Sequence, residues 1–103
     1  PIGILVIRSL IAAGVREIVA IDRLGHRVAT ARMSGAAVAV EVDAADIAEP
    51  ELGGCDVVFE CAGEDVAIDA ALWMARPGGR VVLVGIPSPD RMSFSASMAR
   101  RRA

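Results

Sequence analysis

Short runs rich in valine and isoleucine alternate with longer alanine-rich segments along this chain, and no other feature constrains its fold as strongly. The pattern predicts strands at residues 17–21, 37–42, 56–60 and 80–84. It predicts helices at residues 2–13, 25–33, 64–74 and 95–102. Strands that alternate with helices form right-handed βαβ units, so we predict an α/β fold with a doubly wound parallel sheet.

Turn and capping residues separate these predicted elements. Gly14 stands where the first helix would end, and Ser34-Gly35 where the second would end. Pro77-Gly78-Gly79 predicts a tight turn, and Ser95 is the predicted N-cap of the last helix. Residues 43–54 are polar and acidic, which predicts a connection with one helical turn.

Length and composition indicate one small globular domain. The chain has 103 residues, of which 54% are hydrophobic and 23% are charged, so it is too apolar to be disordered. The net charge of −2 and the isoelectric point near 5.3 argue against nucleic-acid binding, and no apolar run reaches membrane-spanning length. Two cysteines are too few for a disulfide framework, which favours a reducing compartment, the cytoplasm.

A glycine and an acid form a spaced pair near the start of the chain. Gly3 opens the first predicted helix, and Asp22 follows the first apolar strand, nineteen residues later. This is the second half of a dinucleotide-binding fingerprint, in which the helix N-terminus binds the pyrophosphate and the acid binds the adenosine ribose. The first half, a strand with two more glycines, would lie just upstream of Pro1. We therefore predict an incomplete sheet of Rossmann type, and a partial dinucleotide-binding domain over residues 1–103.

Each member of this pair also has an ordinary structural explanation. Gly3 could simply let a helix pack on its strand, and Asp22 could simply start a turn; the spacing favours the ribose role. Arg23 is adjacent and could serve a 2′-phosphate, but the Asp22 carboxylate would repel one, so NAD is favoured over NADP. Arg27 could stack on the adenine, although a solvated surface arginine explains it equally well.

Two further strand ends carry glycine and small or apolar residues. In a doubly wound sheet the ligand lies beyond the carboxyl ends of the strands, which here are residues 60–63 and 84–87. Glycines at these positions suit backbone contact with a cofactor, with ordinary loop glycines as the alternative. The sequence contains no acid, base or nucleophile arranged for catalysis, and we predict no catalytic residue.

The sequence predicts no metal site. Cys55 and Cys61 flank one predicted strand, about 20 Å apart at ~3.3 Å per residue. Zinc–thiolate bonds of ~2.3 Å cannot join cysteines at that separation.

In combination these motifs resemble the cofactor domain of the medium-chain zinc-dependent dehydrogenases, most of all the sorbitol (polyol) dehydrogenase branch. The resemblance rests on Pro1-Ile2-Gly3, Asp22, Arg27, residues 59–63 and residues 76–85, and it covers essentially the whole chain. It implies the NAD-binding portion of an oxidoreductase that transfers a hydride between an alcohol or polyol and the nicotinamide. It also implies that the catalytic zinc domain and the first and last strands are absent, so the chain alone would be inactive.

The resemblance assigns cofactor contacts to individual residues. Ile2 would cover the pyrophosphate and ribose side, and Cys61 and Ala62 would line the adenosine side of the groove. Val84, Gly85 and Ile86 would lie along the nicotinamide. The complete predicted cofactor-binding set is Ile2, Gly3, Asp22, Arg23, Arg27, Cys61, Ala62, Val84, Gly85 and Ile86.

Two other functions stay open at this point. An S-adenosylmethionine-dependent methyltransferase core also has Pro-Gly-Gly before a branched strand and an acid after an earlier one, although Pro1-Ile2-Gly3 argues against it. A non-catalytic nucleotide-binding module would bind NAD without a zinc domain. For the dehydrogenase, the resemblance implies a small alcohol or polyol substrate and a homo-oligomer, with no nucleic-acid or membrane partner. We also expect the chain to be unstable alone, because the absent first strand would be central to the sheet.

Overall fold

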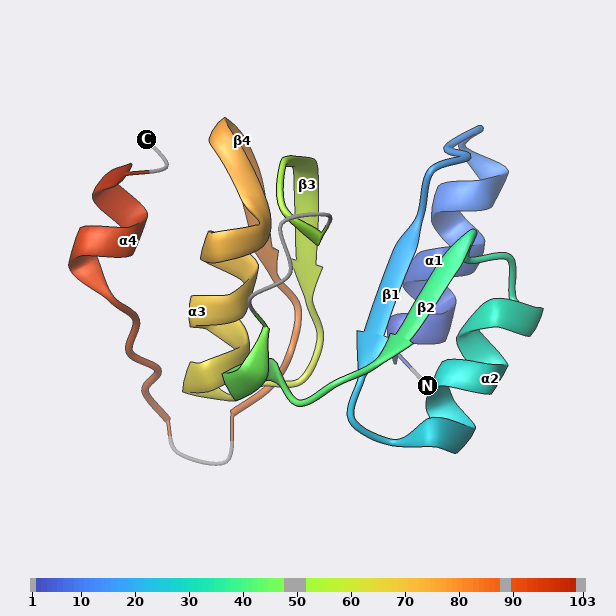
Figure 1. Cartoon of the computed structure of the whole chain (residues 1–103), viewed down its shortest axis with the longest axis horizontal. Helices are drawn as coiled ribbons and strands as arrows, with labels where there is room; N and C mark the ends of the chain where they lie inside the picture. The colour runs from blue at the N-terminus through green and yellow to red at the C-terminus, as the bar shows by residue number, and fades with distance from the viewer. Residues whose placement is uncertain (1, 48–51, 88–89, 102–103) are drawn as a thin grey trace. The chain divides into compact units, whose positions relative to one another are not determined.

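The computed structural model describes residues 2–47, 52–87 and 90–101, and the chain divides into two compact units, residues 1–46 and 47–103. The predicted alternation of helices and strands is confirmed, and most element bounds differ from the prediction by one or two residues (Figure 1). The elements are α1 (Ile2–Ala12), β1 (Val19–Asp22), α2 (Gly25–Met33), β2 (Val38–Glu41), the 3₁₀ turn η1 (Ala44–Asp46), β3 (Cys55–Glu60), α3 (Asp65–Met74), β4 (Ala75–Leu83) and α4 (Ala96–Arg101).

The first unit contains a parallel pair of strands with two helices packed on it. β1 and β2 pair in register from Val19 opposite Val38 to Asp22 opposite Glu41. Small residues of the sheet face the helices. Ala39 is buried, and Ala20, which pairs with it on β1, packs against the same core. The buried core of the unit is Ile7, Ile18, Val28, Ala31, Ala36 and Ala39.

Both helices of the first unit end where the sequence predicted, at Gly14 and Gly35, and each end forms a Schellman motif. Gly14 has a φ of +89°, and the Val15 N–H donates to the Leu10 carbonyl at 3.0 Å. Gly35 has a φ of +114°, and the Ala36 N–H donates to the carbonyl five residues earlier at 3.1 Å. The positive φ explains why glycine occupies both positions.

The second unit contains another parallel pair, β3 and β4, with α3 packed against it. Its buried apolar residues are Leu52, Ile68, Ala70, Ala71 and Ala75. Within the described ranges the four strands thus form two two-stranded sheets, β1-β2 and β3-β4.

The prediction of a tight turn at residues 77–79 before a strand beginning at residue 80 is wrong in one respect. β4 begins at Ala75, which pairs with Cys55, and the next pair is Val57 with Arg80. Residues 76–79 therefore lie opposite the single residue Asp56, as an irregularity inside the ladder rather than a turn before it. Gly78, with a φ of +76°, accommodates the bend.

The segment before α4 is held against α3 by two carboxylates. Asp65 accepts hydrogen bonds from the Ser93 N–H and hydroxyl, both at 2.9 Å, and these bonds lower the pKa of the Asp65 carboxyl. Asp69, one turn further along α3, accepts the Ser95 N–H at 2.8 Å. Ser95 is also the N-cap of α4, as predicted, because its Oγ accepts the Met98 N–H at 3.2 Å.

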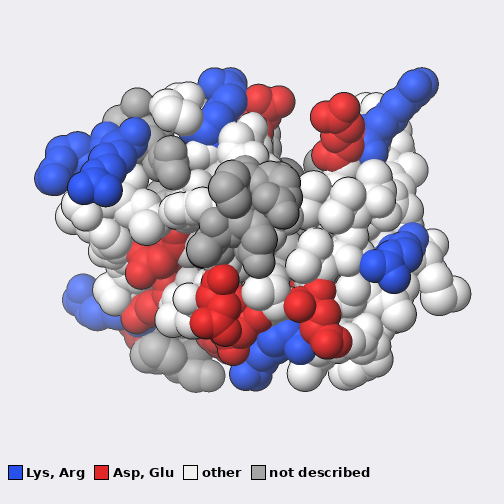
Figure 2. Space-filling model, in the orientation of Figure 1, with Lys and Arg blue, Asp and Glu red and all other residues white. Residues whose placement is uncertain are grey.

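The last turn of α4 contains Arg100 and Arg101, and blue atoms gather over this helix in Figure 2. Both arginines are exposed, which agrees with a solvated helix end. Arg102, the predicted last residue of this helix, lies outside the described residues, as do residues 48–51 of the predicted connection. Among the helices described, none combines the length and the apolar character needed to span a membrane.

Candidate cofactor-binding site

Asp22 is the last residue of β1 and has one carboxylate oxygen engaged locally. Its Oδ1 accepts the Leu24 N–H at 2.9 Å. Asp22 therefore does start a turn, which was the alternative explanation given for it from the sequence. Its Oδ2 lies 3.9 Å from Arg27 Nη1, and both side chains are partly exposed to solvent. An exposed pair at this distance contributes little to stability. The Asp22 side chain is 32% exposed, so its carboxylate is partly open to solvent.

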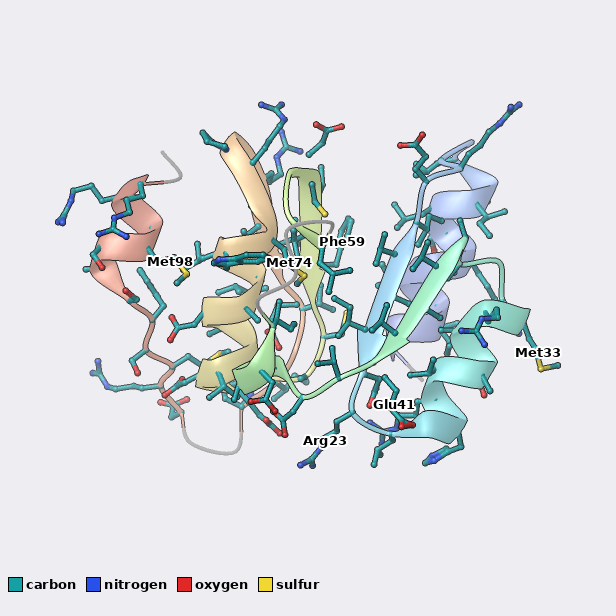
Figure 3. All side chains as sticks on the ribbon, in the orientation of Figure 1. Arg23, Met33, Glu41, Phe59, Met74 and Met98 are labelled. Atoms are coloured by element: carbon teal, nitrogen blue, oxygen red, sulfur yellow. The ribbon has the colours of Figure 1, made fainter. Side chains whose placement is uncertain are left out.

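Glu41 is a second carboxylate at the same end of the first unit, and it was not predicted from the sequence as a site residue. It ends β2 directly opposite Asp22 in the parallel register. A Cβ placed on Gly25 would collide with Glu41 Oε1, so the Glu41 carboxylate lies against the first residue of α2 (Figure 3). Free N–H groups at a helix start favour a negative charge there. The signal that could have found Glu41 is its position at the carboxyl end of the neighbouring strand.

The other predicted residues of the first unit lie toward the same end. Ile2 and Gly3 are the first two residues of α1, which begins at the end toward which β1 and β2 point (Figure 1). Ile2 is exposed, whereas Gly3 is only partly so. Arg23 is exposed, extends away from the strands in Figure 3, and makes no ion pair among the residues described.

In the second unit, Glu60 accepts hydrogen bonds from both predicted cofactor-contacting loops, the one at residues 61–63 and the one at residues 84–87. Its side chain is only 4% exposed, and its Oε1 accepts the Ala62 N–H at 2.7 Å and the Gly63 N–H at 2.6 Å. Its main-chain carbonyl accepts the N–H groups of Val84 and Gly85, both at 2.9 Å. One buried residue thus holds three of the predicted cofactor-binding residues. From the sequence, Glu60 was predicted to end a strand, but no function was predicted for its side chain.

Two glycines allow these loops to touch. A Cβ on Gly85 would collide with the Gly63 nitrogen and lie 2.7 Å from the Gly63 Cα. A Cβ on Gly63, whose φ is +76°, would lie 2.6 Å from the Ile86 carbonyl oxygen. From the sequence, such glycines were predicted to allow backbone contact with a cofactor. The structure gives them an additional reason, the contact between the loops themselves.

The remaining predicted residues of the second unit differ in exposure. Ala62 is exposed, and Ile86 is 89% exposed, although it is a large apolar side chain at a strand end. Cys61 is partly buried; this burial, and next the neighbouring Glu60 carboxylate, raise the pKa of its thiol. A raised pKa disfavours the thiolate, the form in which a cysteine acts as a nucleophile. Within the described ranges no three His, Cys, Asp or Glu side chains come together as metal ligands.

Comparison with known proteins gives a match over the whole chain. A family model described as zinc-binding dehydrogenase matches residues 1–103. The D-xylulose reductase of Saccharomyces cerevisiae is 32% identical over 107 residues, which cover 95% of this chain and 30% of that protein.

Solved structures agree with the sequence comparison. The L-idonate 5-dehydrogenase of Escherichia coli superposes with a TM-score of 0.83 at 25% identity, covering 99% of this chain and 30% of that one. A Sinorhizobium meliloti protein solved with bound NADP gives a TM-score of 0.79 at 28% identity, covering 98% and 32%. The chain therefore spans about a third or less of the length of the proteins it matches. The predicted α/β fold of Rossmann type is confirmed.

Proposed function

The chain belongs to the zinc-binding dehydrogenase family, and we propose that it is the NAD-binding portion of a longer oxidoreductase. In this proposal the longer protein transfers a hydride between an alcohol or polyol and the nicotinamide, which accepts or supplies the hydride when bound. The relatives named D-xylulose reductase and L-idonate 5-dehydrogenase support a polyol or sugar-acid substrate class. The family match favours this function over the methyltransferase alternative.

The position of the Asp22 carboxylate is the observation that supports the proposal most directly. This carboxylate is partly exposed at the carboxyl end of β1, where a carboxylate can accept the ribose hydroxyls of an adenosine. Glu41, opposite Asp22 in the register, adds a second negative charge at this end. Two carboxylates would repel a 2′-phosphate, which supports NAD. Arg23, Arg27 and the NADP-bound relative point the other way, so the choice of cofactor needs a direct test.

The other contacts follow the same proposal. The start of α1, at Ile2 and Gly3, would bind the pyrophosphate, because free N–H groups at a helix N-terminus favour an anion. Cys61 and Ala62 would line the adenosine side of the cofactor. Val84, Gly85 and Ile86 would lie along the nicotinamide. The catalytic zinc would be bound by another domain of the longer protein. In this proposal the longer protein is a homo-oligomer and is located in the cytoplasm.

Replacing Asp22 by serine in the longer protein tests the selector role. We expect the ratio of kcat/KM for NAD to kcat/KM for NADP to fall about 10- to 100-fold, because hydrogen bonds to a charged group contribute about 1.5–3 kcal/mol. Steady-state kinetics with each cofactor at saturating alcohol would measure it.

Asp43→Ser is the matched control for that experiment. Asp43 Oδ1 accepts the Ala45 N–H at 3.1 Å, so it makes the same kind of turn as Asp22 but lies two residues after β2. Loss of the turn alone would affect both variants in the same way. An unchanged ratio in Asp22→Ser, or an equal fall in Asp43→Ser, would rule out Asp22 as the selector.

A further inference from the structure

Glu60 has one satisfied and one unsatisfied carboxylate oxygen. Oε1 accepts two backbone N–H groups, whereas Oε2 is buried and has no hydrogen-bond partner among the residues described. A buried carboxyl oxygen without a hydrogen-bond partner costs free energy. Glu64, four residues later, is a glutamate of the same segment whose side chain is exposed.

The position of Glu60 indicates where a donor would come from. Glu60 is the last residue of β3, and β4 pairs with one edge of that strand. In the part of the chain that is described, no strand pairs with the other edge of β3. In a doubly wound sheet that edge is occupied, and the neighbouring strand and the loop after it carry N–H donors.

We propose that Glu60 is a positioning residue for the cofactor-contacting loops, and that its Oε2 accepts a hydrogen bond from the segment of the longer protein that pairs with the open edge of β3. This inference rests on the proposed function. Oε1 fixes Ala62 and Gly63, while the Glu60 carbonyl fixes Val84 and Gly85. A donor on Oε2 locks the same side chain from the opposite direction. The Glu60 side chain thereby links the order of the Ala62–Gly63 loop to completion of the sheet. The loop at Gly85 and Ile86 is affected through its close contact with Gly63.

Glu60→Gln in the longer protein tests this proposal. Glutamine presents one oxygen and one NH₂ group, so it satisfies either the loop N–H groups or the outer donor, but not both. We expect the Kd for NAD, measured by calorimetry, to rise about tenfold or more, because about 1.4 kcal/mol corresponds to a factor of ten. We also expect a lower unfolding midpoint. Glu64→Gln makes the same chemical change at an exposed position and should leave both values at those of the wild type.

Kinetics separate positioning from a purely structural effect. Positioning raises the KM for NAD with little change in kcat per folded molecule. A purely structural role lowers the amount of active enzyme and leaves the KM unchanged. Should Glu60→Gln fail to fold, Glu60→Asp, which keeps the charge but shortens the side chain, takes its place with the same readouts and the same expected directions.

Two results would overturn the proposal. An unfolding midpoint of the variant at or above that of the wild type would show that no donor faces Oε2. A wild-type Kd and KM for NAD would show that Glu60 does not position the loops. Failure of the proposed function would look different, because the wild-type protein itself would then not bind NAD, while the unfolding midpoints would still test the donor.

Discussion

Heated on its own, the 103-residue chain is expected to lose its structure in a broad transition, well below the ~45–65 °C at which ordinary domains unfold. The reason lies in the faces of the two sheets. Val19 and Val38, paired across β1 and β2, are 41% and 48% exposed. Val57 on β3 and Leu83 on β4 are 42% and 53% exposed. Parallel sheets are normally covered on both faces, so these side chains lack cover that the fold requires.

The size of the effect follows from burial. Full burial of a valine or leucine side chain contributes about 1.5–3 kcal/mol, so four half-exposed ones forgo several kcal/mol. That is a large part of the ~5–15 kcal/mol net stability of a typical domain. Circular dichroism against temperature, together with binding of a hydrophobic dye, would measure it. A single cooperative transition at a high midpoint, without dye binding, would contradict the expectation.

In the longer protein, Gly63→Ala is expected to cost about 3 kcal/mol or more of unfolding free energy. Two effects add: an alanine at a φ of +76° is strained, and its Cβ would lie 2.6 Å from the Ile86 carbonyl oxygen. That oxygen belongs to the backbone, so it cannot move aside as a flexible side chain would. Denaturant titration of the two proteins would give the difference.

Gly54→Ala is the matched control, because it isolates the steric part. Gly54 has the same φ of +76°, but a Cβ there would meet nothing within 4 Å. It should therefore cost only the backbone strain, about 1–2 kcal/mol. Equal losses in the two variants would show that contact between the loops contributes nothing.

Periodic features of the chain were predictable from its sequence. Branched runs and alanine-rich segments predict the order of strands and helices, because side-chain periodicity is a local property. Gly14 and Gly35 predict two helix ends for a similar reason. The start of β4 was missed because Pro77-Gly78-Gly79 indicates an ending, whereas pairing with β3 continues on both sides of it.

Residues of the candidate site were predictable only where the sequence of a single strand is enough to identify them. Asp22 was found because it ends an apolar run at the expected distance from Gly3. Glu41 was missed because its importance depends on the register with β1. Glu60 was missed because its burial and its bonds to two loops depend on contacts between segments far apart in the sequence.

Hydrogen–deuterium exchange of the longer protein, with and without NAD, tests the central claim most directly. We predict that NAD slows exchange at residues 22–27 and 84–87, while the buried middle of α3 is unchanged. Asp22→Ser should weaken the protection at residues 22–27. The absence of NAD binding, or binding that protects other regions and leaves these two segments unchanged, would contradict the assignment of this chain as an NAD-binding unit.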